Sequence, residues 1–201
     1  MKKFLTVLKW VAAAIIATFV LLVIIRVPHA IDLAKTNEQV AKIHATKLTM
    51  DDVLGTNLPP DPGPDADKTV AGIDANHNGI RDDVELAIFK EYPNSAKTRA
   101  VLLQYALMMQ MEMTLPLLNS GTATAAVEDN ESRANICLWT LSSRDDMHKF
   151  IADVDGYRNF VEQKQVNTDL RKSYMHKFYE YVVSYSSSND GCDIDIAGIN
   201  G

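Results

Sequence analysis

Residues Asp74 to Glu85, DANHNGIRDDVE, alternate oxygen-bearing side chains with other residue types around a glycine. The alternation puts carboxylate or amide oxygens at the first, third, fifth, ninth and twelfth positions. Ca²⁺ prefers six to eight hard oxygen ligands, and a twelve-residue loop supplies them from these positions and from the seventh backbone carbonyl. The candidate ligands of one Ca²⁺ ion are Asp74, Asn76, Asn78, Ile80 through its carbonyl, Asp82 and Glu85.

Other residues of this segment favour a weak cation site. Gly79 stands at the sixth position, where the chain must turn sharply. Glu85 falls in the first turn of an expected helix, where the helix dipole favours a carboxylate. His77 and Arg81 dilute the local negative charge, so we expect a Kd of about 10⁻⁴–10⁻³ M. The alternative is a metal-free turn, in which Asp and Asn side chains bond their own backbone.

The segment resembles the DxDxDGxxDxxE/D calcium loops of thrombospondin type 3 repeats, dockerin modules and EF-hands. The resemblance covers 12 of the 201 residues, and it implies a bound ion but no particular activity. No long helix leads into the loop and no second loop exists to pair with it, so a calmodulin-like opening switch is not expected. More loosely, an anchored chain with a proline-rich segment before one such loop is similar to envelope proteins of Gram-negative bacteria, and this likeness implies no function.

The N-terminal segment predicts a membrane anchor. An unbroken apolar run extends from Trp10 to Ile25, and at 1.5 Å per residue it spans roughly 24 Å of the ~30 Å hydrocarbon core. With its apolar flanks, residues 4–27 are expected to cross the lipid bilayer once. Three lysines before the run and one arginine after it predict a cytoplasmic N-terminus and a periplasmic body at the bacterial inner membrane. The alternative is a cleaved signal peptide, for which Pro28-His29-Ala30 is the best cleavage site.

Charge and cysteine usage agree with an exported body. The formal net charge is −6, but residues 1–30 hold four basic residues and no acids, which leaves 16 basic against 26 acidic residues in the rest. This acidic balance argues against a nucleic-acid partner, because binding phosphates requires a basic surface. The two cysteines, Cys137 and Cys192, are expected to form a disulfide in an oxidising compartment; the alternative is a pair of buried free thiols.

The remaining chain predicts an all-α fold, a bundle of about five helices after the N-terminal transmembrane helix and a proline-rich linker. We expect an anchor over 1–30, a helical stalk and linker over 31–67, and a calcium-loop and helical domain over 68–201. Pro59 to Pro64 contain four prolines in six residues, which excludes a helix or central strand there. Caps and apolar periodicity predict helices at residues 83–92, 95–115, 122–141, 144–163 and 167–187, and the second of these is apolar around most of its circumference.

Weaker features have a structural and a functional interpretation. Met108, Met109, Met111 and Met113 are core residues, part of a groove for a protein partner, or thioether ligands for copper. Tyr174, Phe178, Tyr181 and Tyr185 form either a packing seam or a protein-binding face.

No catalytic residue is predicted, because His148 and His176 have no accompanying nucleophile or paired carboxylate. We expect an anchored accessory subunit that binds another envelope or inner-membrane protein and is not an enzyme. The alternatives are a hydrolase-like envelope enzyme with a structural Ca²⁺ site, and a metal-handling protein that uses the methionines.

Overall fold

The computed structural model describes residues 2–116, 119–185 and 191–199 and divides the chain into two units, Met1–Glu38 and Gln39–Gly201. Helix α1 (Lys2–Ala45) contains Pro28 and runs from the first unit into the second. Its apolar residues are exposed along residues 4–27, and among the described residues it is the one helix long and apolar enough to cross a membrane. It has the length and composition of a membrane anchor or of a signal segment.

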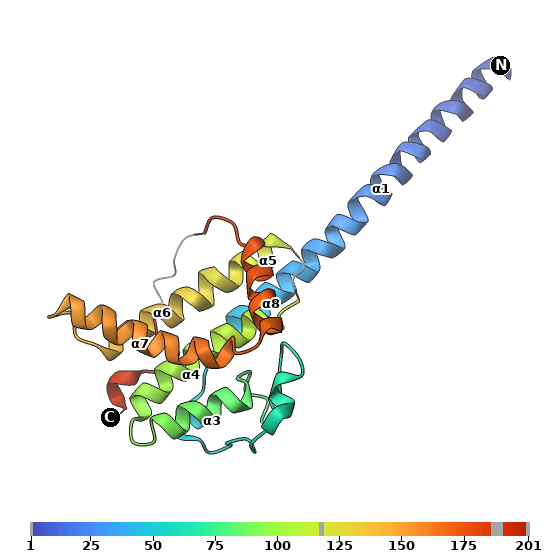
Figure 1. Ribbon diagram of the computed structural model, residues 1–201. Helices are drawn as coiled ribbons and strands as arrows, with labels where there is room; N and C mark the ends of the chain where they lie inside the picture. Colours follow the sequence, from blue (N-terminus) through green and yellow to red (C-terminus); the bar gives the residue numbers. More distant parts are fainter. Residues whose placement is uncertain (1, 117–118, 186–190, 200–201) are drawn as a thin grey trace. The chain divides into compact units, whose positions relative to one another are not determined.

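The second unit consists of short and medium helices joined by loops (Figure 1). No strand occurs in the described residues, so the predicted all-α fold is confirmed. After α1 the elements are α2 (Met50–Leu54), η1 (Gly63–Asp67), α3 (Asp82–Glu91), α4 (Ala96–Thr114), α5 (Ser120–Ala126), η2 (Val127–Glu131), α6 (Ser132–Leu138), η3 (Trp139–Leu141), α7 (Met147–Gln165), α8 (Asp169–Glu180) and η4 (Ile196–Gly198).

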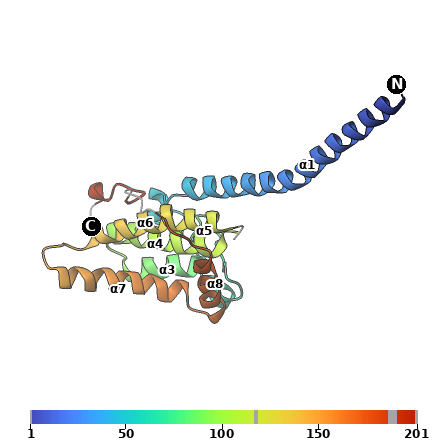
Figure 2. The same ribbon diagram turned by 90° about the horizontal axis from the view of Figure 1, so that it is seen from above.

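Helix α4 is the centre of this unit. Every residue from Thr98 to Met113 is buried, and α4 contacts α2, α3, α6, α7 and α8. Figure 2 shows α6 on one side of α4 and α3 and α7 on the other. A helix without a polar face must be covered on all sides, and the surrounding helices supply that cover.

The region predicted as one helix over 122–141 is divided into four elements. Helix α5 begins where the Asn119 side chain accepts a hydrogen bond from the Thr122 amide at 3.1 Å. A π-helical turn, η2, then separates α5 from α6, and η3 ends the region. A π turn inserts an extra residue into the helical ladder and changes the direction of the side chains that follow.

Most of the segment expected to be a stalk and linker, from Gln39 onward, belongs to the second unit. Ile43, Val53 and Ala66 are buried. Thr49 and Asp52 form a reciprocal capping box at the start of α2, which fixes this short helix locally. Apolar residues before and after the proline-rich segment therefore contribute to the core.

A buried arginine binds residues 66–70, which follow the proline-rich segment. Arg171 on α8 is fully buried. Its guanidinium donates hydrogen bonds to the carbonyls of Ala66, Thr69 and Val70, the latter two at 3.1 Å, and pairs with Asp67 at 2.7 Å. The five donors of one arginine thus satisfy several carbonyls of this irregular segment together.

The predicted disulfide between Cys137 and Cys192 is present and attaches the C-terminal segment to α6. The residue after it, Asp193, forms a buried ion pair with Arg133 at 2.5 Å. Asp193 also accepts a hydrogen bond from the backbone amide of Leu48 at 3.0 Å. One covalent bond and one carboxylate thus connect the chain's last segment to α6 and to the region before α2.

Candidate metal centre

The 74–85 loop is curled by hydrogen bonds between its own side chains and backbone. Asp74 accepts bonds from the amides of Asn78 at 3.2 Å and Gly79 at 3.0 Å. Asn78 accepts one from the Ile80 amide at 2.8 Å. Gly79 has φ of +86°, a left-handed conformation that only glycine adopts without strain. These bonds bend the loop around the oxygens at its first, third and fifth positions.

The last two predicted ligands come from the first turn of α3 and are only 1% exposed. Asp82 accepts a hydrogen bond from the Ala75 amide at 3.0 Å, and its own amide donates to the Ile73 carbonyl at 2.9 Å. Glu85 accepts a hydrogen bond from the Asn76 side-chain amide at 3.1 Å. Both carboxyls therefore turn back from α3 toward the curled loop.

Burial dominates the electrostatics of the acids in this loop. Burial raises the pKa of Asp82, and the charge of Asp74 raises it further. Burial also raises the pKa of Glu85 to about 7, with a smaller contribution from the charge of Asp82. Among the described residues, no lysine or arginine forms an ion pair with Asp74, Asp82 or Glu85. Buried carboxylates without a cationic partner are costly, and a bound cation offsets that cost.

The donor set fits a hard cation such as Ca²⁺. The described part of the chain contains no group of three or more His, Cys, Asp or Glu side chains arranged to hold a metal ion by themselves. The loop combines its acids with the amides of Asn76 and Asn78 and with the Ile80 backbone. The Asn78 side-chain nitrogen is buried without a hydrogen-bond partner, so polar groups in the loop are incompletely satisfied.

Arg81 does not act as expected from its position in the loop. We expected its charge to dilute the site, but its side chain is fully buried and bound elsewhere. It pairs with Asp83 at 2.5 Å and donates to the Gln165 carbonyl at 3.0 Å and to the Lys164 carbonyl at 2.6 Å. These carbonyls lie at the C-terminal end of α7, where a positive charge is favoured by the helix dipole. Arg81 is thus a structural anchor for the loop.

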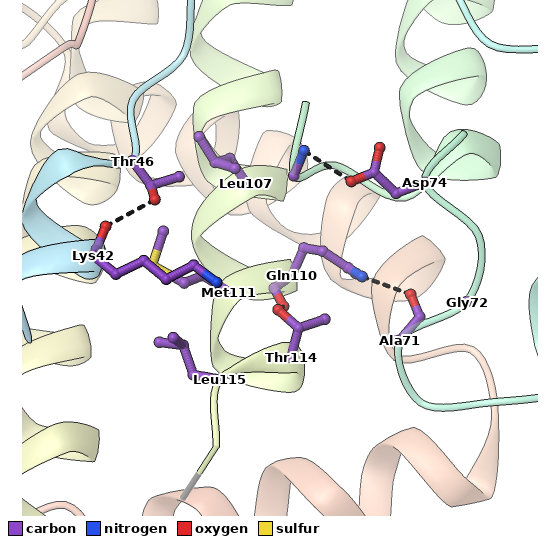
Figure 3. A pocket seen from close by; sticks show the side chains of 11 residues that line it. Lys42, Thr46, Ala71, Gly72, Asp74, Leu107, Gln110, Met111, Thr114 and Leu115 are labelled. Carbon is purple, nitrogen blue, oxygen red and sulfur yellow. Dashed lines mark hydrogen bonds between the residues drawn. The ribbon is translucent and has the colours of Figure 1, made fainter. Parts of the chain in front are cut away.

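A cavity of about 300 Å³ adjoins the loop (Figure 3). It lies between the C-terminal end of α1, the 71–79 segment and α4, and Asp74 and Gly79 are part of its wall. On the same wall the Gln110 amide donates to the Ala71 carbonyl at 2.6 Å and positions the chain that leads into the loop. The first predicted ligand, Asp74, is therefore reached from this cavity.

The weaker predicted features lie in several places. The four methionines of α4 are buried, as a core interpretation requires. In the aromatic series, Phe178 is buried and Tyr174 half-buried, whereas Tyr181 and Tyr185 are exposed beyond the end of α8. His148 and His176 are exposed on the surface.

Sequence reasoning missed a second group of polar residues. Glu112 and Glu131 contribute to a separate cavity together with Glu162, Tyr105 and Tyr179. One signal for this group was present in the sequence, because Glu112 is the single acidic residue of the otherwise apolar and polar-neutral segment from Val101 to Leu115. An acid on a helix that is buried all round requires a specific reason.

Comparison of the chain with protein-family models, with curated proteins and with solved structures found no match. The function must therefore be inferred from the residues and their arrangement.

Proposed function

We propose that this protein is a membrane-anchored, periplasmic helical module that is stabilised by one Ca²⁺ ion and binds other components of the cell envelope. The observation that carries the proposal is the curled 74–85 loop, in which Asp74 caps the turn and Asp82 and Glu85 are buried at the start of α3 without an ion-pair partner among the described residues. The exposed apolar helix α1 supports the anchor, and the disulfide supports an oxidising compartment.

The role proposed for the ion is structural. The loop lies between the proline-rich segment and α3, and two of its acids belong to the first turn of α3. A bound Ca²⁺ would hold Asp74 close to Asp82 and Glu85 and so fix the angle at which α3 begins. Because Arg81 connects the same segment to α7, the ion and this arginine together would determine how α3 packs on the bundle.

Thermal unfolding of the full-length protein in detergent tests the ion site. Ca²⁺ at a hundred-fold excess over Kd is expected to stabilise the folded state by about 2.7 kcal/mol. In a chain of this size, each kcal/mol of stabilisation raises Tm by roughly 2–4 °C. The variant Asp74→Asn with Glu85→Gln should lose the shift. The matched control, Asp61→Asn with Glu91→Gln, changes two acids outside the loop and should keep it.

Two outcomes would count against the Ca²⁺ site. One is a wild-type protein that, after treatment with a chelator, shows no change in Tm on addition of Ca²⁺ at a hundred-fold excess over the expected Kd, about 10–100 mM. The other is an equal shift in the loop variant and in the control. Addition of Mg²⁺ in place of Ca²⁺ should give a smaller shift, because Mg²⁺ requires a more rigid octahedral arrangement and retains water.

The anchor and the binding role are tested in cells. The mass of the mature protein should equal that of the full chain, whereas a loss of about 3 kDa would show a cleaved signal segment. Crosslinking in intact membranes followed by affinity purification should recover a stable envelope partner. Consistent recovery of the protein alone would contradict the proposal that it is an accessory subunit.

A further inference from the structure

A second cavity, of about 620 Å³, lies among α4, the η2–α6 region, α7 and α8. It is distant in sequence from the 74–85 loop, and no predicted Ca²⁺ ligand is part of its wall. Its volume is that of a site for a small organic molecule, and much larger than a bare ion requires. The lining residues are Tyr105, Met108, Met109, Glu112, Glu131, Asn135, Arg158, Glu162, Val166, Met175 and Tyr179.

Glu112 is the most informative residue of this cavity. Its side chain is 1% exposed, and one carboxyl oxygen, Oε2, accepts a hydrogen bond from the Tyr179 hydroxyl at 3.4 Å. The other oxygen, Oε1, is buried and has no hydrogen-bond partner. A buried acceptor without a partner costs about 1–3 kcal/mol, and more when it is charged. A ligand that donates a hydrogen bond to this oxygen would remove the cost.

Glu131 presents a second unpaired oxygen to the same cavity. Its Oε2 atom is buried and without a hydrogen-bond partner. Glu131 is the last residue of the π-helical turn η2, a type of irregularity that occurs frequently at functional sites. The charge of Glu131 raises the pKa of Glu112, in addition to the larger effect of burial, which shows that the two carboxyls interact.

The charges of the described lining residues are unbalanced. Three carboxylates face one cation, Arg158, which is already hydrogen-bonded to Asp155 and Asn135, each at 3.2 Å. The third carboxylate, Glu162, accepts a hydrogen bond from the Tyr105 hydroxyl at 2.8 Å. The unpaired acceptors therefore belong to Glu112 and Glu131. A ligand with several donors and a positive charge would satisfy both and would replace the proton that burial otherwise keeps on Glu112.

The rest of the wall indicates what kind of cation fits. Met108, Met109, Met175 and Val166 provide an apolar surface. Thioether side chains are flexible and polarizable, and they adapt to aliphatic chains of different shape. Tyrosine rings in the same wall favour a nearby cation through their π-electrons. The described acids of this wall do not form a group of three that could hold a metal ion.

We propose that this cavity binds a small aliphatic amine, whose ammonium group pairs with Glu112 and Glu131 and whose hydrocarbon chain lies along Met108, Met109 and Met175. The ammonium group provides three donors for the unpaired carboxyl oxygens, and the methionines bury the apolar chain. The hydrogen bond from Tyr179 holds the Glu112 carboxyl in position. This site is independent of the ion bound by the 74–85 loop.

Calorimetric titration of the full-length protein in detergent with n-butylamine tests the proposal. The wild-type protein should bind the amine and should not bind n-butanol, which has the same chain length without the charge. Glu112→Gln should weaken binding by about tenfold or more, because an amide cannot pair with the ammonium charge. The control Glu180→Gln removes an exposed acid of α8 and should leave the affinity unchanged.

Two further variants ensure that a folding defect and a failure of the Ca²⁺ site are not mistaken for a failure of the amine site. If Glu112→Gln fails to fold by circular dichroism, Glu131→Gln decides, since this residue is less buried than Glu112. Absence of amine binding by the wild type, equal binding of n-butanol, or undiminished binding by the folded variant would overturn the proposal. Asp74→Asn with Glu85→Gln should retain amine binding, so failure of the Ca²⁺ site and failure of the amine site are separable.

Discussion

Arg81 donates a hydrogen bond to the carbonyl oxygen of Gln165 at 3.0 Å, which joins the 74–85 loop to the C-terminal end of α7. The two residues are 84 positions apart, and both are fully buried. Gln165 continues the connection inward, because its side-chain amide donates to the Ala106 carbonyl of α4 at 2.9 Å. The loop is therefore attached to the core through a chain of hydrogen bonds that does not involve any predicted metal ligand.

The first prediction concerns Arg81. Arg81→Met preserves much of the side-chain volume but leaves Asp83 and the α7 carbonyls without their donors, so the free energy of unfolding should fall by about 3 kcal/mol. Denaturant unfolding with a chelator present measures this change. Lys68→Met is the control, because Lys68 pairs with Asp65 on the surface and its loss should cost less than about 1 kcal/mol. Equal effects of the two substitutions would contradict an anchoring role for Arg81.

The second prediction compares two substitutions of glycine by alanine. At Gly79 a Cβ atom would lie 2.9 Å from Leu107 Cδ1, and φ is already left-handed, so Gly79→Ala should destabilise the protein by about 1–3 kcal/mol. At Gly156, within α7, nothing lies within 4 Å of the added atom, so Gly156→Ala should stabilise it by about 1 kcal/mol. Denaturant unfolding of both variants in chelator should show opposite signs.

The third prediction concerns the pH dependence of stability. Burial holds the pKa of Glu112 well above the value of 4.5 typical of an exposed glutamate. Without a bound amine, the folded chain then keeps a proton that the unfolded chain releases above pH 4.5, and the ammonium group of a ligand would take the place of this proton. This contribution to stability is lost as pH rises toward the folded-state pKa. Glu112→Gln removes this pH dependence. The free energy of unfolding of the variant minus that of the wild type should therefore increase from pH 5 to pH 8. Denaturant unfolding between pH 5 and pH 8 measures this difference, with Glu180→Gln as the control. A difference that does not change with pH would refute the raised pKa of Glu112.

The fourth prediction concerns the disulfide. The bond joins cysteines 55 residues apart, and closing a loop of that length stabilises the folded state by about 4 kcal/mol in the chain-entropy model. Replacing both cysteines by serine should lower the free energy of unfolding by roughly this amount. The unfolding midpoint of the wild type should fall when a reductant is added, whereas that of the double variant should not respond. A wild-type protein insensitive to reductant would show that the bond contributes little.

Local signals in the sequence predicted the helical framework well. The helices expected at 83–92 and 95–115 are observed at Asp82–Glu91 and Ala96–Thr114, because a serine cap and two prolines mark their ends in the sequence itself. The uniform apolar character of the second also predicted its central position. The disulfide was predicted from two cysteines in a body that the N-terminal segment led us to expect outside the cytoplasm.

Features that depend on distant partners were not predictable in the same way. Arg81 and Arg171 are charged residues that a sequence places on the surface, yet both are buried because backbone carbonyls far along the chain surround them. The π turn that divides residues 122–141 has no comparable local signature. The interaction of Glu112 with Glu131 brings together two elements that are adjacent only after packing. The Ca²⁺ ligands stay a prediction, to be tested by the variants described above.

The position of Arg171 has a consequence for the order in which the protein is assembled. The carbonyls of Thr69 and Val70 receive their donors from a residue 102 and 101 positions later, and the Leu48 amide receives its acceptor from Asp193, 145 positions later. A ribosome makes the early segment first, so it remains without these partners until nearly the whole chain has emerged. The hydrogen bonds of Leu48, Thr69 and Val70 therefore form only after the C-terminal helices and tail have been made. A chain truncated before residue 171 would lack the donors to the Thr69 and Val70 carbonyls.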